Sequence, residues 1–255
     1  MGRDDVDIEV TIGGREYSAG ELAAVEIARS YFTLHELHRL GAVMQDRSGV
    51  GLSDRGIDAV PRSRVRSVLV DNKLRLGRRQ INRMYRGQYR EADDMWHRLV
   101  VASDGDYGRK AARTHLVVTG LTAGKCARLA VSATARLGTL LTAMEPDHLD
   151  VGATHVTEVM GMYGRPTQMR GRLGVESPIP LAADHPVRLV GASSLVSDPS
   201  LVNAVAVHQM EWIPGGVDIL AAACFPSAAP QELVDGHAVH MAIEFSNLFR
   251  VGLRM

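Results

Sequence analysis

Residues 114–158 read THLVVTGLTAGKCARLAVSATARLGTLLTAMEPDHLDVGATHVTE, and this stretch decides the fold that the sequence predicts. The apolar run at 115–118 predicts a short strand, and the glycine-containing segment 119–124 predicts a loop. A long helix is predicted from about residue 125 to about residue 144, and the polar segment 145–150 follows it. No other part of the sequence places a thiol, an amine, histidines and carboxylates so near a helix start, so we expect the functional site here.

After residue 144 the apolar residues change from helical spacing to alternation, which predicts strands at 154–161, 168–175, 187–195, 202–212, 217–224 and 237–249. Segments rich in glycine and proline separate them, and no helix is predicted in between. Consecutive strands of this kind favour an antiparallel sheet. The predicted fold class is therefore α+β, with a long central helix packed on a curled antiparallel sheet and a mixed N-terminal region. We divide the chain into an N-terminal α/β region (1–110) and a helix-plus-sheet domain (111–255).

The composition excludes several classes of protein. Lys and Arg together number 29, as do Asp and Glu, so the formal net charge of zero argues against a general polyanion binder. Two cysteines cannot form a disulfide framework, which fits the reducing cytoplasm. The sequence shows no apolar signal segment and no uninterrupted apolar run long enough to span a membrane. Aromatic residues make up 5%, which disfavours the stacking of single-stranded nucleic acid. We expect a cytoplasmic globular protein.

The N-terminal region carries two local signals. The alternating segment 8–12 and the Gly-Gly turn after it predict a hairpin. Ser18 and Glu21 have the spacing of a capping box, which predicts a helix that continues to about residue 40. This helix places His35 and His38 on one face, where they could share a metal ion, but no third ligand is nearby in the sequence. We interpret them as residues of a solvated helix face.

The segment from Arg62 to Arg90 is strongly basic, with ten cations and the single acidic residue Asp71. Two structures compete for it: a hairpin at 65–76 with a two-residue turn, and a helix-turn-helix with helices at 62–72 and 78–86. Its charge can be balanced by acidic residues elsewhere in the chain, by an acidic carrier protein or partner subunit, or by duplex DNA. We rank these in that order, so nucleic acid is disfavoured.

The loop before the predicted central helix, GLTAGKC, is similar to a phosphate-binding loop but lacks two of its features. Three residues rather than four separate its glycines, and Cys126 takes the place of the hydroxyl that would bind magnesium. A glycine-containing loop that opens a helix still offers free N–H groups to an anion. We therefore predict that Thr122, Gly124 and Lys125 bind a carboxylate or phosphate group of a substrate.

The predicted catalytic residues are Cys126, His148, His155 and Glu158. Cys126 lies near a helix N-terminus, where the dipole favours the thiolate, and imidazole beside carboxylate suits general acid–base catalysis. The structural alternatives are a buried cysteine on an alanine-rich helix and a solvated connection at 145–150. His155 and Glu158 would face opposite sides of a strand, so we predict no metal site, and no cofactor motif is present. We expect Lys125, Cys126, His148 and His155 to line one cavity with a C-terminal histidine.

The segment 128–141, RLAVSATARLGTLL, within the strand, loop and helix at 115–144, resembles the hotdog superfamily, and within it the A-factor-synthase-like group. The resemblance covers residues 110–255 and implies a long helix wrapped by a curled antiparallel sheet, in an enzyme of bacterial secondary metabolism. The Asp-His-Pro approach to the helix and the acidic residue inside it are missing from this sequence. No catalytic residue is carried over for that reason.

These observations predict a small-molecule enzyme that uses acid–base or thiol chemistry on a carboxylate- or thioester-bearing substrate, and the resemblance implies a role in biosynthesis. Two alternatives belong to other classes of protein. The chain could be a non-catalytic partner subunit whose sheet completes the site of a homo- or hetero-oligomer. It could also be a DNA-binding regulator that uses residues 62–90.

Overall fold

The structure is a computed structural model and describes residues 6–152 and 154–254. One antiparallel sheet of nine strands dominates it, with the strand order β2-β1-β5-β11-β10-β9-β8-β7-β6. Its strands are β1 (Asp7–Ile12), β2 (Arg15–Tyr17), β5 (Lys110–Thr119), β6 (His148–Val151), β7 (His155–Glu158), β8 (Thr167–Leu173), β9 (Val187–Leu195), β10 (Val202–Ile213) and β11 (Gly216–Phe225). The predicted α+β class, with a helix packed on an antiparallel sheet, is confirmed.

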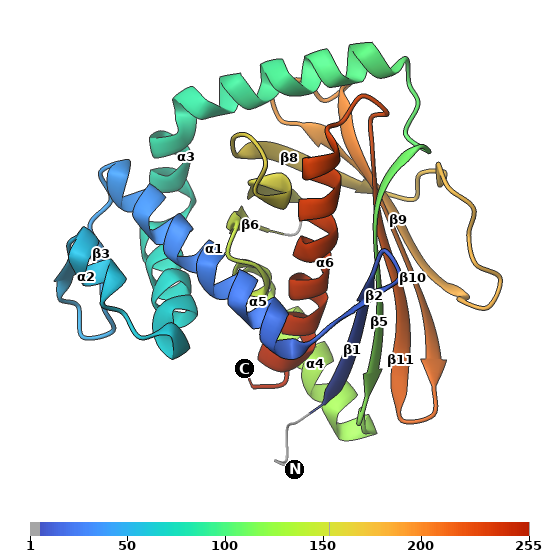
Figure 1. Ribbon diagram of the computed structural model, residues 1–255, viewed down its shortest axis with the longest axis horizontal. Helices are drawn as coiled ribbons and strands as arrows, with labels where there is room; N and C mark the ends of the chain where they lie inside the picture. The colour runs from blue at the N-terminus through green and yellow to red at the C-terminus, as the bar shows by residue number, and fades with distance from the viewer. Residues whose placement is uncertain (1–5, 153, 255) are drawn as a thin grey trace.

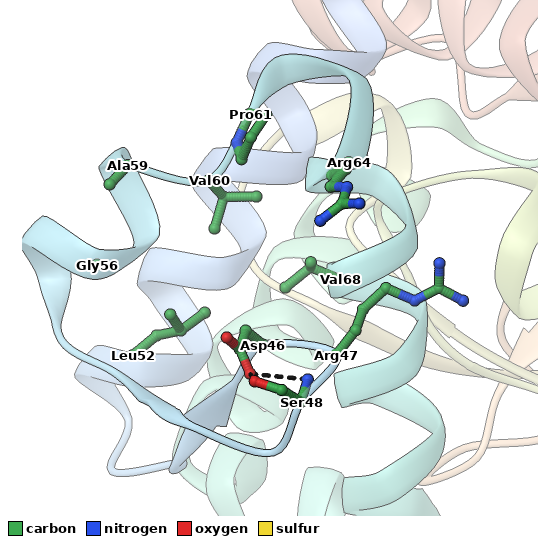
Figure 2. Close-up of a pocket in the computed structure, with 10 residues that line it drawn as sticks. All are labelled: Asp46, Arg47, Ser48, Leu52, Gly56, Ala59, Val60, Pro61, Arg64 and Val68. Carbon is green, nitrogen blue, oxygen red and sulfur yellow. Dashed lines mark hydrogen bonds between the residues drawn. The ribbon is translucent and has the colours of Figure 1, made fainter.

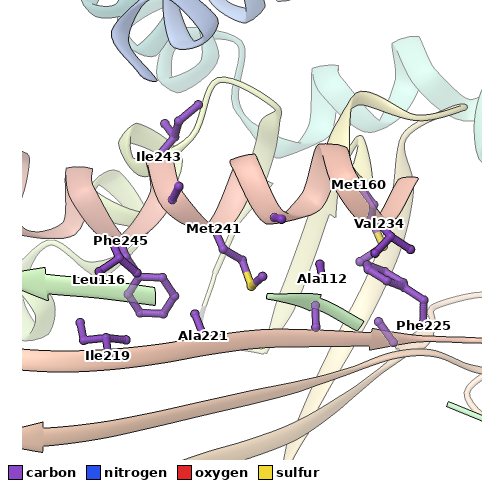
Figure 3. Packing of buried hydrophobic residues seen from close by; sticks show 14 of the residues in the cluster. Ala112, Leu116, Met160, Ile219, Ala221, Phe225, Val234, Met241, Ile243 and Phe245 are labelled. Carbon is purple, nitrogen blue, oxygen red and sulfur yellow. The ribbon is translucent and has the colours of Figure 1, made fainter. Parts of the chain in front are cut away.

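The helix that packs on the sheet is α6 (Gln231–Gly252), which lies along one face of the sheet (Figure 1). Figure 3 shows Met241 and Phe245 pointing from α6 toward Ile219 and Ala221 of β11. Met241 is 1% exposed and Ile219 is 1% exposed, so this interface excludes water. Burying side chains of this size contributes roughly 1.5–3 kcal/mol each, so the packing of α6 stabilises the sheet.

The predicted strand at 237–249 is wrong, because these residues belong to α6. Sheet, α1, α5 and η1 (Met160–Met162) enclose this helix, so apolar residues occur on more than one of its faces. Alternation and helical spacing are then hard to distinguish. The predicted central helix is also divided into α4 (Ala123–Ala135) and α5 (Leu137–Met144), and α5 packs on α6. The polar connection predicted at 145–150 contains β6 instead.

The N-terminal signals are confirmed. β1 and β2 form the predicted hairpin, and α1 (Ala19–Arg39) begins with the complete capping box. In this capping box the backbone N–H of Glu21 donates to the Ser18 hydroxyl, and the Glu21 carboxylate accepts from the backbone N–H of Ser18. A small lobe follows, made of β3 (Met44–Gln45), β4 (Gly51–Leu52) and α2 (Asp54–Asp58).

The basic segment does not form the predicted hairpin; residues 62–72 and 78–86 are helical, as the second alternative predicted, but they meet at a kink rather than at the turn of a helix-turn-helix. The segment is the first part of one helix, α3 (Arg62–Ser103), which bends at Gly77 (Figure 1). Gly77 has a φ of 65°, a conformation that side-chain-bearing residues rarely adopt. The buried residues Val65, Leu69 and Leu76 follow helical spacing and pack in the core between α1, α3 and the small lobe. No helix in the described part of the chain is both long and apolar enough to cross a membrane.

The close approach of α6 to η1 provides a test of the fold. A Cβ on Gly236 would meet the carbonyl oxygen of Gly161 at 2.2 Å. We expect Gly236→Ala to lower the free energy of unfolding by about 2–3 kcal/mol, because α6 must move away from η1. Gly87→Ala is the control, since an added Cβ there has no neighbour within 4 Å on α3, and it should stabilise the helix by about 0.5–1 kcal/mol. Urea unfolding followed by circular dichroism measures both, and equal stability of the two variants would contradict the packing.

Candidate functional site

A group of charged and polar side chains lies inside the molecule beside the middle of α6. We call it the buried cluster, and it consists of Arg29, Lys73, Glu145, Asp147, His148, Glu158, His237 and His240. An ionised group inside a protein costs several kcal/mol unless it is paired and hydrogen-bonded. So many of them at one place indicate a function rather than a contribution to stability.

Two histidines form the centre of the cluster. The Nε2 atoms of His148 and His240 are 3.2 Å apart. The other ring nitrogen of each histidine has its own acceptor: Nδ1 of His148 lies 2.8 Å from the carbonyl oxygen of Leu141, and Nδ1 of His240 lies 3.2 Å from Oδ2 of Asp147. A carbonyl and a carboxylate accept hydrogen bonds, so each Nδ1 carries a proton. Both Nε2 atoms therefore point at one common position.

Two carboxylates complete this position. Oε2 of Glu158 lies 3.1 Å from Nε2 of His148 and 3.9 Å from Nε2 of His240. The oxygens of Glu244 lie 3.9 and 3.8 Å from the same two nitrogens. The Glu158 side chain is 6% exposed and that of Glu244 is 22% exposed, so Glu244 is the more accessible of the two carboxylates.

Burial and charge act against one another at these groups. Burial alone would lower the pKa of His240, but the carboxylates of Asp147 and Glu158 outweigh it and raise that pKa well above the usual value. Burial would raise the pKa of Glu158, and the imidazole groups of His240 and His148 lower it instead. The rings of His237 and His240 are stacked with their centroids 4.6 Å apart. Burial and the charge of His240 lower the pKa of His237 to about 3. It is neutral at physiological pH.

Two cations hold the segment 145–148 in place. Nη1 of Arg29 lies 2.6 Å from Oε1 of Glu145 and 3.7 Å from Oδ2 of Asp147. Nζ of Lys73 donates hydrogen bonds of 2.6–3.3 Å to four carbonyl oxygens, those of Thr142, Glu145, Pro146 and His148. Burial lowers the pKa of Lys73 to about 7, although the carboxylates of Asp147 and Glu145 act in the opposite direction. Lys73 therefore fixes the backbone from which Asp147 and His148 extend.

A cavity of about 290 Å³ lies between α6 and the sheet and ends at the cluster. Most of its lining is apolar, including Met169, Ala204 and Ala223, whereas His148, Glu158, His240 and Glu244 line it at the cluster. His208 of β10 also lines it, and burial lowers the pKa of this imidazole. Nδ1 of His208 has no hydrogen-bond partner among residues 6–152 and 154–254. An apolar pocket with a few convergent polar groups is the usual form of a small-molecule site.

A larger cavity of about 460 Å³ lies in the small lobe, between α2 and the start of α3 (Figure 2). Its one carboxylate, Asp46, already accepts hydrogen bonds from the backbone and hydroxyl of Ser48 and from the backbone of Val50. Arg47 and Arg64 provide positive charge, but no histidine and no buried carboxylate lines it. It therefore lacks the paired acid and base that catalysis needs.

The structure brings together only part of the predicted site. His148 and Glu158 line the cavity with the C-terminal residues His208, His237 and His240, but Lys125, Cys126 and His155 are not among its lining residues. Nε2 of His155 instead lies 3.1 Å from Oδ2 of Asp150. Cys126 packs against the main apolar core, and Cys224 is buried, which raises the pKa of its thiol to about 11.

The predicted anion loop is used internally. The Thr122 hydroxyl accepts from the backbone N–H of Lys125, as an N-cap of α4 does, and Nζ of Lys125 donates to the carbonyl oxygen of Gly120. Gly124 lies in the first turn of α4. None of the three residues lines the cavity beside α6.

Sequence reasoning missed the contribution of α6. In a helix His237, His240 and Glu244 lie on one face, because they are three and four residues apart. The incorrect strand prediction placed the two histidines on opposite faces. Arg29 and Lys73 were missed for another reason: nothing in a sequence shows that a given cation will be buried opposite a carboxylate more than 70 positions away.

The basic segment is balanced internally only in part. Nε of Arg66 lies 2.7 Å from Oε1 of Glu26, and Nε of Arg78 lies 3.6 Å from Oδ2 of Asp150. A second group, which we call the arginine stripe, is exposed along one face of α3 and consists of Arg79, Arg83, Arg86 and Arg90. Within the described residues none of these four has an ion-pair partner. Pairing inside the chain, the first-ranked expectation, therefore does not explain the stripe.

Comparisons of the chain with protein-family models, with curated proteins and with solved structures find no match.

The role of Lys73 can be tested by Lys73→Met, which keeps most of the side-chain volume but removes the donor to four carbonyls. We expect the free energy of unfolding to fall by about 2–4 kcal/mol, because buried acceptors lose their partner. Arg79→Met on the exposed side of the same helix is the control and should change stability by less than about 0.5 kcal/mol. If chemical denaturation finds Lys73→Met as stable as the wild type, the four hydrogen bonds do no more than offset the cost of burying the ammonium group.

Proposed function

We propose that the protein is an enzyme that acts on a small molecule by acid–base chemistry in the cavity between α6 and the sheet. One observation carries the proposal: the carboxylate of Glu244 borders a mostly apolar cavity and lies 3.8–3.9 Å from two imidazole nitrogens. Inside an apolar pocket such groups exchange protons with a bound substrate rather than with bulk water.

The dimensions and lining of the cavity support a substrate of modest size. A volume of about 290 Å³ is near the lower limit for ligand pockets. The apolar part of the substrate would lie against Met169, Ala204 and Ala223, with its reacting group at Glu244. Arg172, which is exposed and lines the same cavity, would pair with a substrate carboxylate. A carboxylate- or thioester-bearing molecule has this combination of groups.

Glu244 is the proposed general base. It would take a proton from a substrate carbon next to a carbonyl group, or from a water molecule, and return it at the end of the reaction. His208 faces the same cavity with a free ring nitrogen and would act as the second proton acceptor. Thiol chemistry is not part of the proposal, because Cys126 is not among the lining residues.

Exchange of substrate hydrogen with solvent deuterium tests this function. A library of small carboxylic acids and thioesters is first screened by thermal shift, and the ligands found are followed by NMR in D2O. We expect Glu244→Gln to slow exchange by roughly 10²–10⁴-fold with binding retained, because the base is removed but the shape is kept. Glu232→Gln, an exposed carboxylate at the start of the same helix, is the control. Equal rates in both variants would exclude Glu244 as the base.

The arginine stripe favours a second, separate role as a docking surface for an acidic protein. Its four guanidinium groups are exposed and recur every three or four residues, so they lie on one face of α3. On the opposite face of the same helix, the side chains of Ile81, Tyr85 and Trp96 are buried. Because the chain as a whole has no net charge, a local stripe suits a protein partner with a matching acidic face better than a long polyanion.

The partner role predicts salt-sensitive binding that depends on the stripe. A purified acidic acyl carrier protein serves as the probe, at about 50 and about 200 mM salt. Arg83→Glu combined with Arg86→Glu should weaken binding at least about tenfold. The control reverses two exposed arginines in the other half of the helix, Arg62→Glu with Arg64→Glu. Tight binding of duplex DNA in place of the carrier protein, or binding of neither, would overturn this role.

A further inference from the structure

We infer that His148, His240 and Glu158 bind one divalent first-row transition-metal ion at the inner end of the cavity. The role of this ion in catalysis rests on the proposed function, but its binding does not. The three ligand atoms are Nε2 of each histidine and Oε2 of Glu158, and they come from β6, α6 and β7. All three residues line the cavity.

The separations between these atoms match those of ligands around a shared ion. Two ligands that each lie about 2.0–2.1 Å from one ion are roughly 2.9–3.4 Å apart at octahedral to tetrahedral angles. The two Nε2 atoms are 3.2 Å apart, and Oε2 of Glu158 is 3.1 Å from that of His148. Its distance of 3.9 Å to Nε2 of His240 is longer, and a change in the side-chain torsions of Glu158 can close it.

The outer partners of the histidines are those of metal ligands. Metal-bound histidines almost always donate their second N–H to a carboxylate or a backbone carbonyl, which fixes the ring and its tautomer. His240 has Asp147 in this position and His148 has the carbonyl oxygen of Leu141. Asp147 is itself held by Arg29. The cluster therefore contains both the ligands and the groups that orient them.

The arrangement has a physical cost that a cation removes. When both imidazoles are neutral with Nδ1 protonated, the Nε2 lone pairs of His148 and His240 face one another at 3.2 Å beside two carboxylates, whereas in the charged form of His240 a second proton lies between them. Either an additional proton or a metal ion must lie between them. A divalent ion satisfies both nitrogens and the Glu158 carboxylate at once, whereas one proton serves only one pair of atoms.

The donor set selects the class of metal. Two imidazoles and one carboxylate suit iron, zinc, cobalt, nickel or manganese, whereas calcium and magnesium prefer oxygen ligands alone. Three protein ligands leave coordination positions open, as catalytic sites require. These positions face the cavity, and Glu244 lies beside them. A substrate carboxylate or carbonyl group, or a water molecule that Glu244 deprotonates, would fill them.

Metal titration of the full-length protein tests the inference. Protein stripped with a chelator and dialysed is titrated with Zn²⁺, Co²⁺ and Mg²⁺, with calorimetry, cobalt absorption spectra and thermal unfolding as readouts and no substrate present. We expect one equivalent of Zn²⁺ and of Co²⁺ to bind, a rise in the unfolding temperature and no binding of Mg²⁺. Absence of saturable Zn²⁺ and Co²⁺ binding to the wild type would overturn the inference.

Variants locate the ion. Glu158→Gln, which keeps the size of the side chain, should weaken Zn²⁺ binding at least about tenfold, and Asp147→Asn, which acts through His240, by about 10–100-fold. If Glu158→Gln fails to fold, the Zn²⁺ affinity of Asp147→Asn tests the position of the ion instead. The control is His185→Asn in the separate group Asp184–His185–Glu211, which should leave affinity and stoichiometry unchanged. Loss of binding in His185→Asn with normal binding in Glu158→Gln would place the ion elsewhere.

The two proposals fail in different ways. If zinc binds as expected but Glu244→Gln exchanges substrate hydrogen as fast as the wild type, the metal site stands and the proposed base is wrong. If Glu244→Gln is inactive but the wild type binds no transition metal, the acid–base function stands and the buried histidines share a proton.

Discussion

The structure depends on one constraint: where α6 passes the segment 145–148, charged groups are removed from water and must be satisfied by the protein itself. Arg29 pairs with Glu145, Asp147 pairs with His240, and Lys73 binds four backbone carbonyls. Removal of one partner from such a network leaves a buried charge uncompensated, which costs more than the pair contributes when intact. The elements that supply these partners, α1, α3, β6, β7 and α6, are therefore held in one arrangement.

Much of the fold was predictable because it depends on local signals. The predicted strands at 187–195, 202–212 and 217–224 agree with β9, β10 and β11, since each alternates and ends at a turn. The helix α3 was not predictable in the same way. Asp71 and Asn72 resemble a turn, but Asn72 is buried in the helix, and its side chain exchanges hydrogen bonds with the backbone of Gln45. A tertiary contact thus overrides a local turn signal.

The candidate site was predictable to a smaller extent, for a related reason. His148 and Glu158 belong to the polar stretch that the sequence makes conspicuous, and both line the cavity. Thr122 and Lys125 have the pattern of an anion site, yet the cap of α4 and the carbonyl of Gly120 already use their polar groups. His240 and Glu244 enter the site only because α6 is a helix that packs on the far side of the cavity, which no short-range pattern specifies.

The position of α6 in the chain has a consequence for the order of folding. All strands of the sheet precede residue 231, whereas the helix that covers its apolar face follows. During synthesis the sheet is therefore complete before its cover exists, and Met169, Ile219 and Phe225 remain accessible until α6 has left the ribosome. Contacts between segments so far apart in sequence form slowly, because a long loop must close first. Between completion of the sheet and docking of α6, the face of the sheet that α6 covers therefore exposes apolar side chains.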